Sequence, residues 1–190
     1  GLTSIEVMEF IVENARLEFV DCSKDSITRN VFPTCNIFIK HILVDSAHQG
    51  KVRLFNADDI SITLGSYSLT MKNGMNKLSF GEIGLSTASG EVYVKDFHLE
   101  PLYNKHDYTR KLGFQTDWVD LRISKLSLKR MNLRSLLFEG KMHAGLLEID
   151  TLTLDDYRDK RVPLKPGFKP PMPQEGLRKL KTYLRIDTVL

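Results

Sequence analysis

The sequence predicts a mainly β protein with an elongated, curved antiparallel meander sheet (a β-groove) and two short helices. Three observations lead to this fold class. An eight-residue pattern of apolar and polar residues recurs along the chain, short turns separate its copies, and the long crossovers that parallel strands require are absent between them.

The recurring pattern is apolar-x-apolar-x-x-apolar-x-apolar. In residues 147–154, for example, two polar residues interrupt the alternation between Ile149 and Leu152. Because successive side chains of a flat strand point to opposite faces, a strand with this spacing must bulge, bend or change sheets at the gap to keep its apolar residues together. Repeated bends would curl the sheet into a trough with an apolar inner face. The other copies are Ile5/Val7/Phe10/Val12, Ile37/Ile39/Ile42/Val44, Ile62/Leu64/Tyr67/Leu69, Leu78/Phe80/Ile83/Leu85, Val92/Val94/Phe97/Leu99 and Leu121/Ile123/Leu126/Leu128, with a partial copy at Leu184/Ile186/Val189.

Turn residues divide the chain between these strands. Asn73-Gly74 is the clearest hairpin signal, because this pair favours positive φ at both centres of a type I′ turn. Residues 22–33 are predicted to form a loop, and residues 101–115 a polar, aromatic loop with room for a helical turn. The predicted strands cover residues 5–12, 17–19, 36–44, 52–54, 60–71, 77–85, 92–99, 116–128 and 145–154.

Two segments have helical spacing. Leu133, Leu136 and Leu137 predict a short helix over residues 131–139 that ends at Gly140. Leucines three and four residues apart predict a second, amphipathic helix over residues 175–184, which either plugs one end of the sheet or lies on an anionic membrane surface. Residues 162–173 hold five of the seven prolines and are predicted to form an extended strap that crosses outside the sheet.

Length and composition indicate one folded domain over residues 1–190. The hydrophobic content of 42% and the charged content of 27% are those of an ordinary folded domain. A net charge of +3, spread along the chain, predicts no nucleic-acid partner. The apolar pattern is already present at Ile5 and continues to the last residues, so we expect a segment of a longer, repetitive β protein. Cys22 and Cys35 flank the predicted loop and are expected either to remain free thiols or to pair as a disulfide in an oxidising compartment.

The sequence contains no recognisable catalytic or metal-binding motif. Its five histidines fall into no metal-ligand spacing, and Gly-Ser-Tyr-Ser at residues 65–68 lacks the second glycine of a nucleophile elbow. There is no Walker or dinucleotide glycine pattern. We therefore predict neither an enzyme nor a metal or cofactor site, and a hydrolase is the least favoured alternative.

Two sets of residues are candidates for binding. The charged cluster after residue 154 offers Arg158, Lys160 and Arg161 as an anion or headgroup site, although a solvated turn with local ion pairs explains the same residues. The apolar pattern offers a lipid groove, in which acyl chains are buried without polar recognition. A closed sandwich core without ligand, or a scaffold that adds a partner's strand at a sheet edge, would have the same pattern. The lipid-groove candidates are Val92, Val94, Leu121, Ile123, Leu147 and Ile149.

Several segments resemble one family. Arg158-Asp-Lys-Arg-Val-Pro163 after an alternating strand, the proline-rich strap, and Leu177-Arg-Lys-Leu180 leading into Leu184-Arg-Ile-Asp-Thr-Val189 are similar to the AsmA-like envelope proteins of Bacteroidetes-type bacteria. Leu99-Glu-Pro-Leu-Tyr103 and Gly113-Phe-Gln-Thr-Asp117 resemble inter-strand segments of that family. The resemblance covers residues 61–190. This chain departs from the family pattern by lacking the amino-terminal membrane helix and a carboxy-terminal completion.

The resemblance implies a role but no catalytic residues. It implies a periplasmic module of a protein anchored in the inner membrane of a Gram-negative envelope. Such a module would shelter or conduct lipid along a β-groove during outer-membrane biogenesis. The expected partners are lipid or a membrane surface and the remainder of the parent chain.

Overall fold

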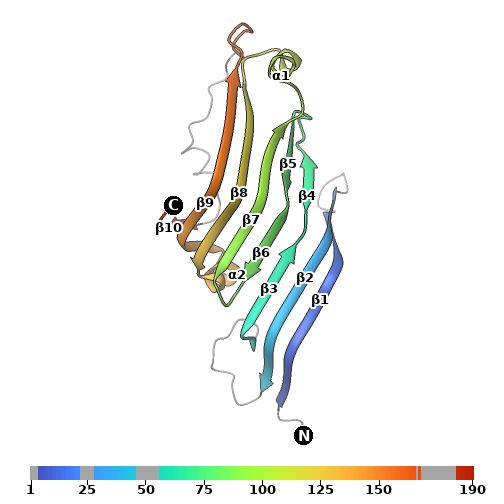
Figure 1. The fold of residues 1–190 in the computed structure, drawn as a ribbon, viewed down its shortest axis with the longest axis vertical. Coiled ribbons are helices and arrows are strands. Elements are labelled where there is room, and N and C mark those ends of the chain that lie inside the picture. Colours follow the sequence, from blue (N-terminus) through green and yellow to red (C-terminus); the bar gives the residue numbers. More distant parts are fainter. Residues whose placement is uncertain (1–3, 22–27, 46–55, 166, 168–182) are drawn as a thin grey trace.

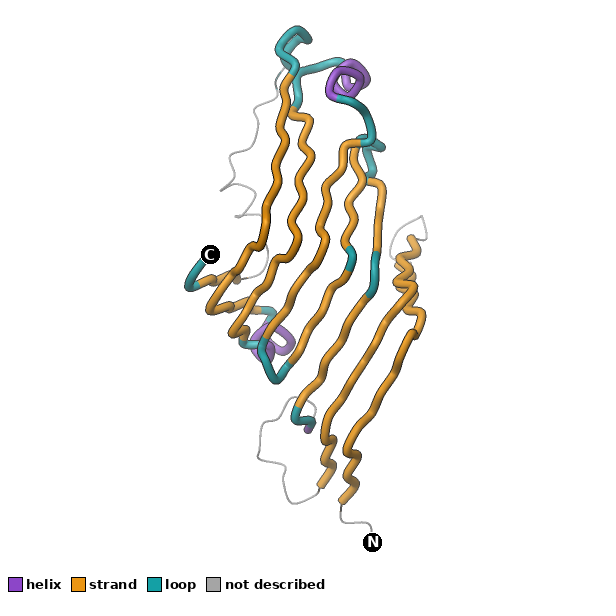
Figure 2. Tube along the Cα trace, viewed as in Figure 1, coloured by secondary structure: helices purple, strands orange, loops and turns teal. Residues whose placement is uncertain are grey.

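The structure is an open, curved β-sheet with two short helices (Figure 1, Figure 2). It is a computed structural model that describes residues 4–21, 28–45, 56–165, 167 and 183–190. The predicted fold class is confirmed for these residues. The strands are β1 (Ser4–Asp21), β2 (Thr28–Asp45), β3 (Asp59–Leu64), β4 (Tyr67–Thr70), β5 (Asn76–Phe80), β6 (Glu82–Ser86), β7 (Glu91–Pro101), β8 (Asp117–Met131), β9 (Lys141–Arg158) and β10 (Tyr183–Ile186), and the helices are α1 (Lys105–Leu112) and α2 (Leu133–Glu139).

The strands follow one another across the sheet as a meander. Their order is β1-β2-β3-β6-β7-β8-β9-β10, and β4 and β5 continue β3 and β6 in the same register. Neighbours are antiparallel as far as β9, which is the arrangement that short turns allow. The last strand departs from the predicted antiparallel meander, because β10 lies parallel to β9. Residues 159–182 separate these two strands and are long enough for the crossover.

A line of backbone irregularities crosses the sheet at the polar gap of the eight-residue pattern. Asp96 in β7 and Thr151 in β9 have positive φ angles of 52° and 40° inside otherwise extended strands. Ser124 of β8 lies opposite both, since the registers of these strands continue unchanged on either side of the gap. The expected irregularity at the polar gap is therefore confirmed. It is not a bulge with an extra residue in one strand, because residues 96, 124 and 151 of the three neighbouring strands lie opposite one another. We call this feature the kink line and include in it Gly65 and Gly81, which interrupt β3/β4 and β5/β6.

Side chains of neighbouring strands lie close to the two glycines of the kink line and leave little room for a Cβ atom there. A Cβ atom at Gly81 would lie 2.6 Å from Oδ2 of Asp96, and one at Gly65 would lie 3.0 Å from Cβ of Thr34. The neighbouring strands therefore place side chains over these backbone positions. Steric crowding thus favours glycine in these two strands, whereas β7 and β9 have a residue with positive φ at the gap.

Helix α2 lies against one end of the apolar residues. Asn132 caps it by accepting a hydrogen bond from the backbone N–H of Ser135, and Gly140 ends it with a φ of 64°. Its residue Leu133 is buried with Met131 and Ala144, and Leu85, Val92, Leu128, Leu136 and Met142 pack around this group. The predicted helix over residues 131–139 is confirmed from Leu133 onward, while Met131 belongs to β8.

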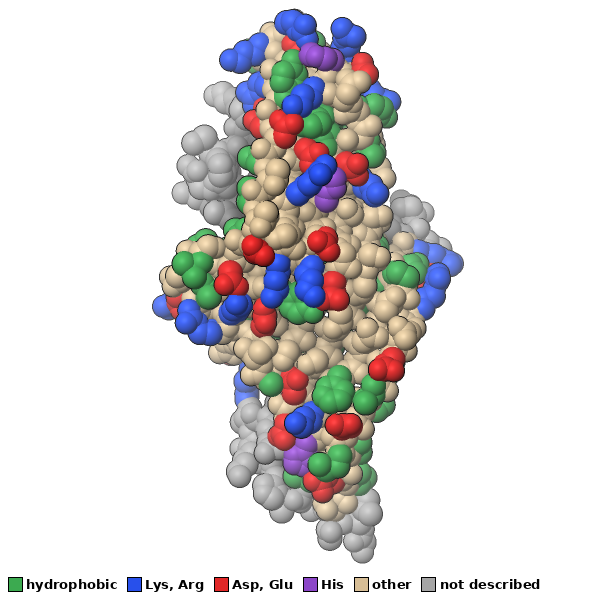
Figure 3. All heavy atoms as spheres, in the orientation of Figure 1, with side chains coloured by type: hydrophobic (Ala, Val, Ile, Leu, Met, Phe, Trp, Pro, Cys, Tyr) green, Lys and Arg blue, Asp and Glu red, His purple; other side chains and the backbone are tan. Residues whose placement is uncertain are grey.

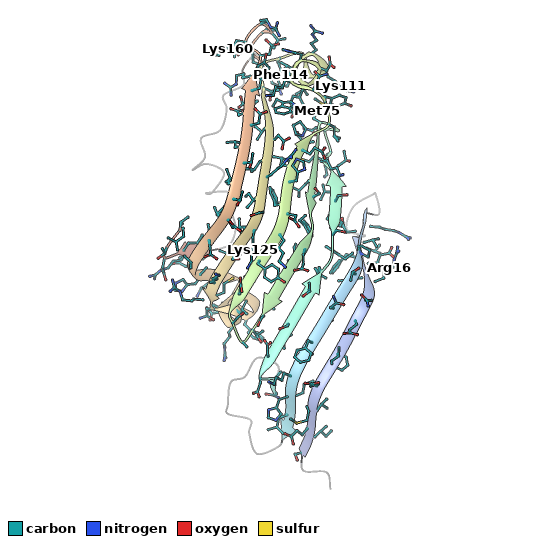
Figure 4. All side chains as sticks on the ribbon, in the orientation of Figure 1. Arg16, Met75, Lys111, Phe114, Lys125 and Lys160 are labelled. Atoms are coloured by element: carbon teal, nitrogen blue, oxygen red, sulfur yellow. The ribbon has the colours of Figure 1, made fainter. Side chains whose placement is uncertain are left out.

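Helix α1 lies at the opposite end of the sheet (Figure 1). Asn104 caps its first turn, and Gly113 ends it in the left-handed conformation. Tyr108 is buried and its hydroxyl accepts a hydrogen bond of 3.0 Å from Asn76 Nδ2. Met75, labelled at this end in Figure 4, is also buried. The expected helical turn within residues 101–115 is thus an eight-residue helix.

Two local predictions need correction, and a third is described only in part. The predicted loop over residues 22–33 is wrong from Thr28 onward, because β2 begins there and pairs with β1. Leu184 belongs to β10 and not to a helix, and residues 175–182 lie outside the described part of the chain. Of the predicted strap, residues 162–165 belong to no strand, while residues 166 and 168–173 are not described.

The hairpin at residues 73 and 74 forms, but with a different turn. Gly74 has a φ of 66°, whereas Asn73 has no positive φ, so the turn is not type I′. The backbone N–H of Gly74 donates to the carbonyl of Met71 at 2.8 Å, and Asn73 Oδ1 accepts from the N–H of Met75 at 3.0 Å. The N–H of Met71 donates to the carbonyl of Asn76, so the loop consists of residues 72–75, and only Gly74 in it has a positive φ.

We expect the substitution Gly74→Val to lower the free energy of unfolding by about 1–2 kcal/mol. No atom lies within 4 Å of a Cβ at this position, so the cost comes from the backbone conformation alone. Urea unfolding measures the change. Lys72→Val in the same turn is the control, and equal stability of the two variants would contradict the assignment.

The strained residue of β9 gives a second prediction. Thr151 is β-branched and has positive φ, which asparagine adopts more readily, so Thr151→Asn should raise the free energy of unfolding by about 1 kcal/mol. Thr153 is equally exposed on the same strand and has no positive φ, and Thr153→Asn should be neutral or destabilising. The same urea experiment compares them, and a loss of stability in the Thr151 variant would show that the kink is not strained.

Candidate functional site

The six predicted groove residues lie together on three neighbouring strands. Val92 and Val94 belong to β7, Leu121 and Ile123 to β8, and Leu147 and Ile149 to β9. Directly opposed residues of neighbouring strands point to the same side of a sheet. Every one of the six is opposed by an apolar residue, so the structure brings them together. The pairs are Val92 with Leu128, Val94 with Leu126, Leu121 with Leu99 and Leu154, Ile123 with Phe97 and Leu152, Leu147 with Leu128, and Ile149 with Leu126.

These pairs belong to four longer rows that cross the sheet. We call the surface formed by the rows the apolar face. The apolar pattern of each strand is visible in the sequence, whereas the alignment of the strands is visible only in the structure. The rows are Val12-Ile37-Ile62-Leu85-Val92-Leu128-Leu147, Cys35-Leu64-Ile83-Val94-Leu126-Ile149, Phe97-Ile123-Leu152, and Leu69-Leu78-Leu99-Leu121-Leu154.

The kink line keeps the rows on one side. Lys95 lies over the ring of Tyr93, which alternates with Val92 and Val94, and His98 contacts Asp120. Lys95 and His98 therefore lie on the polar side of β7, with the positive φ of Asp96 between them. Alternation restarts after Asp96, so that Val94 and Phe97 both point to the apolar face.

The apolar face is only partly shielded from solvent. Ile123, near its centre, has 8% of its surface exposed, whereas Leu152 and Leu154 towards the β9 edge are 52% and 57% exposed. All described strands belong to one sheet, so no second sheet of described residues packs on this face. Within the described residues the structure thus shows no closed sandwich.

An aromatic group extends the apolar face near β2 and β4. The rings of Phe32 and Tyr67 stack with centroids 5.0 Å apart, and Phe80 lies 5.7 Å from Tyr67. Phe19 of β1 meets Phe32 edge-on at 6.0 Å. Phe32 was missed as a face residue because it lies in the predicted loop. The signal that could have found it is the alternation of Leu17 and Phe19, which requires a partner strand at residues 28–33.

The opposite face is polar and charged. Figure 3 shows basic and acidic side chains side by side near its middle, where Figure 4 labels Lys125. Lys95 and Lys125 lie over the Tyr93 ring, 5.1 and 5.2 Å from its centroid. Lys95 also binds Glu82 at 2.8 Å, and this hydrogen bond is the main reason why the pKa of Glu82 is lowered. The two faces therefore differ sharply in chemistry.

The predicted anion site does not present three free cations. Arg158 makes a two-pronged pair with Asp117, and Arg161 makes one with Asp159 at 2.7 and 2.8 Å. Lys160 is exposed and lies at the tip of the turn (Figure 4). Local pairing therefore balances the charge of both arginines.

The remaining polar groups offer little catalytic chemistry. His98 contacts Asp120 at 2.9 Å beside a hollow of about 450 Å³ on the polar side, but Arg122 also binds Asp120 there. This arrangement neutralises the carboxylate instead of activating a nucleophile. Cys35 is a buried free thiol, and Cys22 lies outside the described residues. Within the described residues, no group of three or more His, Cys, Asp or Glu side chains is placed to hold a metal ion.

Comparisons with protein-family models, curated proteins and solved structures gave no match to this chain. Neither helix in the described part of the chain has the length and apolar character needed to cross a membrane.

The Asp159–Arg161 pair predicts an acid-sensitive contact. The side chain of Asp159 is only 6% exposed, and hydrogen bonds from Arg161 hold its pKa well below the ordinary value. A lowered pKa stabilises the fold above the ordinary pKa of aspartate, near 3.8, and this stabilisation is lost as the pH falls through the lower folded value.

We therefore expect Arg161→Gln to lower the melting temperature at pH 7 and to weaken its dependence on pH below 4. Lys160→Gln, one residue away, should change neither. Thermal melts of both variants between pH 2 and 7 make the comparison. If the two variants behave alike, the pair does not stabilise the turn.

Proposed function

We propose that this protein binds the acyl chains of lipids along its apolar face, without catalysing a reaction. The observation that carries this proposal is the continuity of four apolar rows on a sheet that has a charged opposite side. A soluble single-layer sheet exposes apolar side chains at a free-energy cost, and a ligand that covers them removes that cost.

The energetics of such binding follow from area alone. Each methylene that leaves water contributes about 0.8 kcal/mol, so eight methylenes contribute about 6 kcal/mol before the cost of immobilising the chain. Between Leu85 and Leu78 the face crosses the kink line without a charged side chain in its rows. An acyl chain laid along the strands would therefore meet apolar contacts on both sides of the kink.

The helices give the face two ends. Helix α2 covers the end near Val92 and Leu128, and α1 lies at the other end. A chain that binds along the strands would thus run between them. We infer a path for sheltering or conducting lipid that is parallel to β7, β8 and β9.

The cellular setting of this proposal rests on the resemblance of residues 61–190 to AsmA-like envelope proteins. On that basis we propose a periplasmic module whose parent protein is anchored in the inner membrane and takes part in outer-membrane biogenesis. The proposed partners are lipid, a membrane surface and the rest of the parent chain. The acyl-binding proposal itself stands on the apolar face and can be tested without this setting.

Uptake of a fluorescent fatty acid tests the proposal. The unsubstituted protein should bind the fatty acid. The double variant Leu152→Asp/Leu154→Asp should bind it about tenfold more weakly, because each carboxylate must lose water or retain water in place of the ligand. Both leucines are more than half exposed, so the melting temperature should stay within about 2 °C of the parent.

Thr153→Asp provides the matched control, since Thr153 lies between the two leucines and points to the other face. This variant should bind like the parent. The proposal would be overturned if the unsubstituted protein took up no fatty acid, or if the Thr153→Asp control lost as much affinity as the double variant. Ile123 is unsuitable for the same test, because a charge at this buried position would unfold the sheet.

A further inference from the structure

Strands β1 and β2 extend past the start of β3 as a two-stranded ribbon (Figure 1). β2 pairs with β3 only from Cys35 to Lys40, whereas its pairing with β1 continues to Asp45. Beyond Lys40, β1 is therefore the only strand partner of β2 that the described residues contain. We call residues 4–7 and 42–45 the ribbon. Two strands alone are marginally stable, so the contacts at the base of the ribbon decide how firmly it is held.

His41 lies at the base of the ribbon and contacts two carboxylates. Its Nδ1 lies 2.8 Å from Oδ2 of Asp58, directly before β3, and its Nε2 lies 2.8 Å from Oε1 of Glu6 in β1. One imidazole ring thus connects β1, β2 and the residue that leads into β3. The side chain of His41 is 26% exposed, so water screens these contacts only in part.

This geometry requires the charged form of the ring. An ionised carboxylate only accepts hydrogen bonds, and a neutral imidazole has a single N–H donor. The neutral ring can therefore donate to only one of the two carboxylates, and the lone pair of its other nitrogen would face the second. Hydrogen bonds to Asp58 and Glu6 accordingly raise the pKa of His41 above its ordinary value of 6.5, with Asp58 contributing most.

The backbone of His41 is strained as well. Its φ angle is 51°, which is unfavourable for a residue other than glycine. Lys40 and His41 occupy the polar gap of the eight-residue pattern in β2, so the bend at His41 keeps Ile39 and Ile42 on the same side. The two ring contacts therefore hold a bend that the backbone alone disfavours.

Other charged groups near the base belong to the neighbouring residue. Lys40 lies opposite Glu9 of β1 and Asp59 of β3. Asp59 accepts hydrogen bonds from Ser61 and from the turn after β6, and these contacts lower its pKa although its partial burial acts in the opposite direction. The carboxylates that contact the ring of His41 are thus those of Glu6 and Asp58.

We propose that His41 is a pH-sensitive clamp that holds the ribbon in line with β3. The protonated ring donates to Glu6 and Asp58 together, whereas the neutral ring releases one of them and leaves the ribbon free to open. Because the folded pKa is raised, the stabilisation is complete below 6.5 and is lost as the pH rises through the folded value. This inference does not depend on lipid binding.

An NMR titration of the unsubstituted protein tests the protonation step. The ring signal of His41, identified by its absence in the variant His41→Asn, should titrate with a midpoint above 6.5. Glu6→Gln and Asp58→Asn should each lower this midpoint, since an amide does not attract the imidazolium. A midpoint at or below 6.5, or a midpoint that neither variant lowers, would overturn the proposal.

Hydrogen exchange tests the clamp itself. After correction for the intrinsic exchange rate, amides of the ribbon should exchange faster above the midpoint than below it, while those of residues 125–128 in β8 should not change. His41→Asn should exchange fast in the ribbon on both sides of the midpoint, because asparagine tolerates the positive φ but does not titrate.

His143→Asn is the matched control. Within the described residues, His143 contacts a single carboxylate, that of Asp187 at 3.1 Å, so this variant should keep the pH dependence of the ribbon. Equal protection of the ribbon on both sides of the midpoint in the unsubstituted protein would show that His41 titrates without holding the ribbon. That result, or loss of the pH dependence in the control, would contradict the clamp.

Discussion

The structure depends on one constraint: each long strand must keep its apolar residues on one face although two polar residues interrupt its alternation. Backbone irregularities at matched positions meet this constraint. Asp96 and Thr151 adopt positive φ, and Gly65 and Gly81 leave space for side chains of neighbouring strands. From β3/β4 to β9 these irregularities are aligned, and the registers between β7, β8 and β9 continue unchanged on both sides of them. Strands β1 and β2 differ, because their positive φ angles are at Asn14 and His41 and their register shifts after Val12.

An uninterrupted apolar face has a cost in stability. With one layer of described strands, most residues of the rows are only partly buried, and the buried apolar groups gather near the helices, as Met131 and Leu133 do beside α2. Polar contacts within turns, such as those of Arg161 with Asp159, add local stabilisation. The architecture therefore maximises accessible apolar area instead of core volume, which suits a protein that binds extended apolar ligands and is unusual for a self-sufficient domain.

The two faces differ in what they can recognise. The apolar face offers area without polar specificity, so it would bind acyl chains of many kinds with similar affinity. The charged face pairs its own lysines and glutamates, as Lys95 does with Glu82, and has little charge left for a partner.

Most of the strands, the gap within them and the helix that ends at Gly140 can be predicted from the sequence, because these features follow from side-chain periodicity and local φ and ψ preferences. The sequence also predicts the six groove candidates as one apolar set, since Val92 and Ile149 each occupy an apolar position of the pattern. The structure adds which residues oppose one another, that β10 is parallel to β9, and that Phe32 joins the apolar face. It also showed that Arg158 and Arg161 are paired. Register and ion pairing depend on contacts between residues far apart in the chain, and a local pattern carries no information about them.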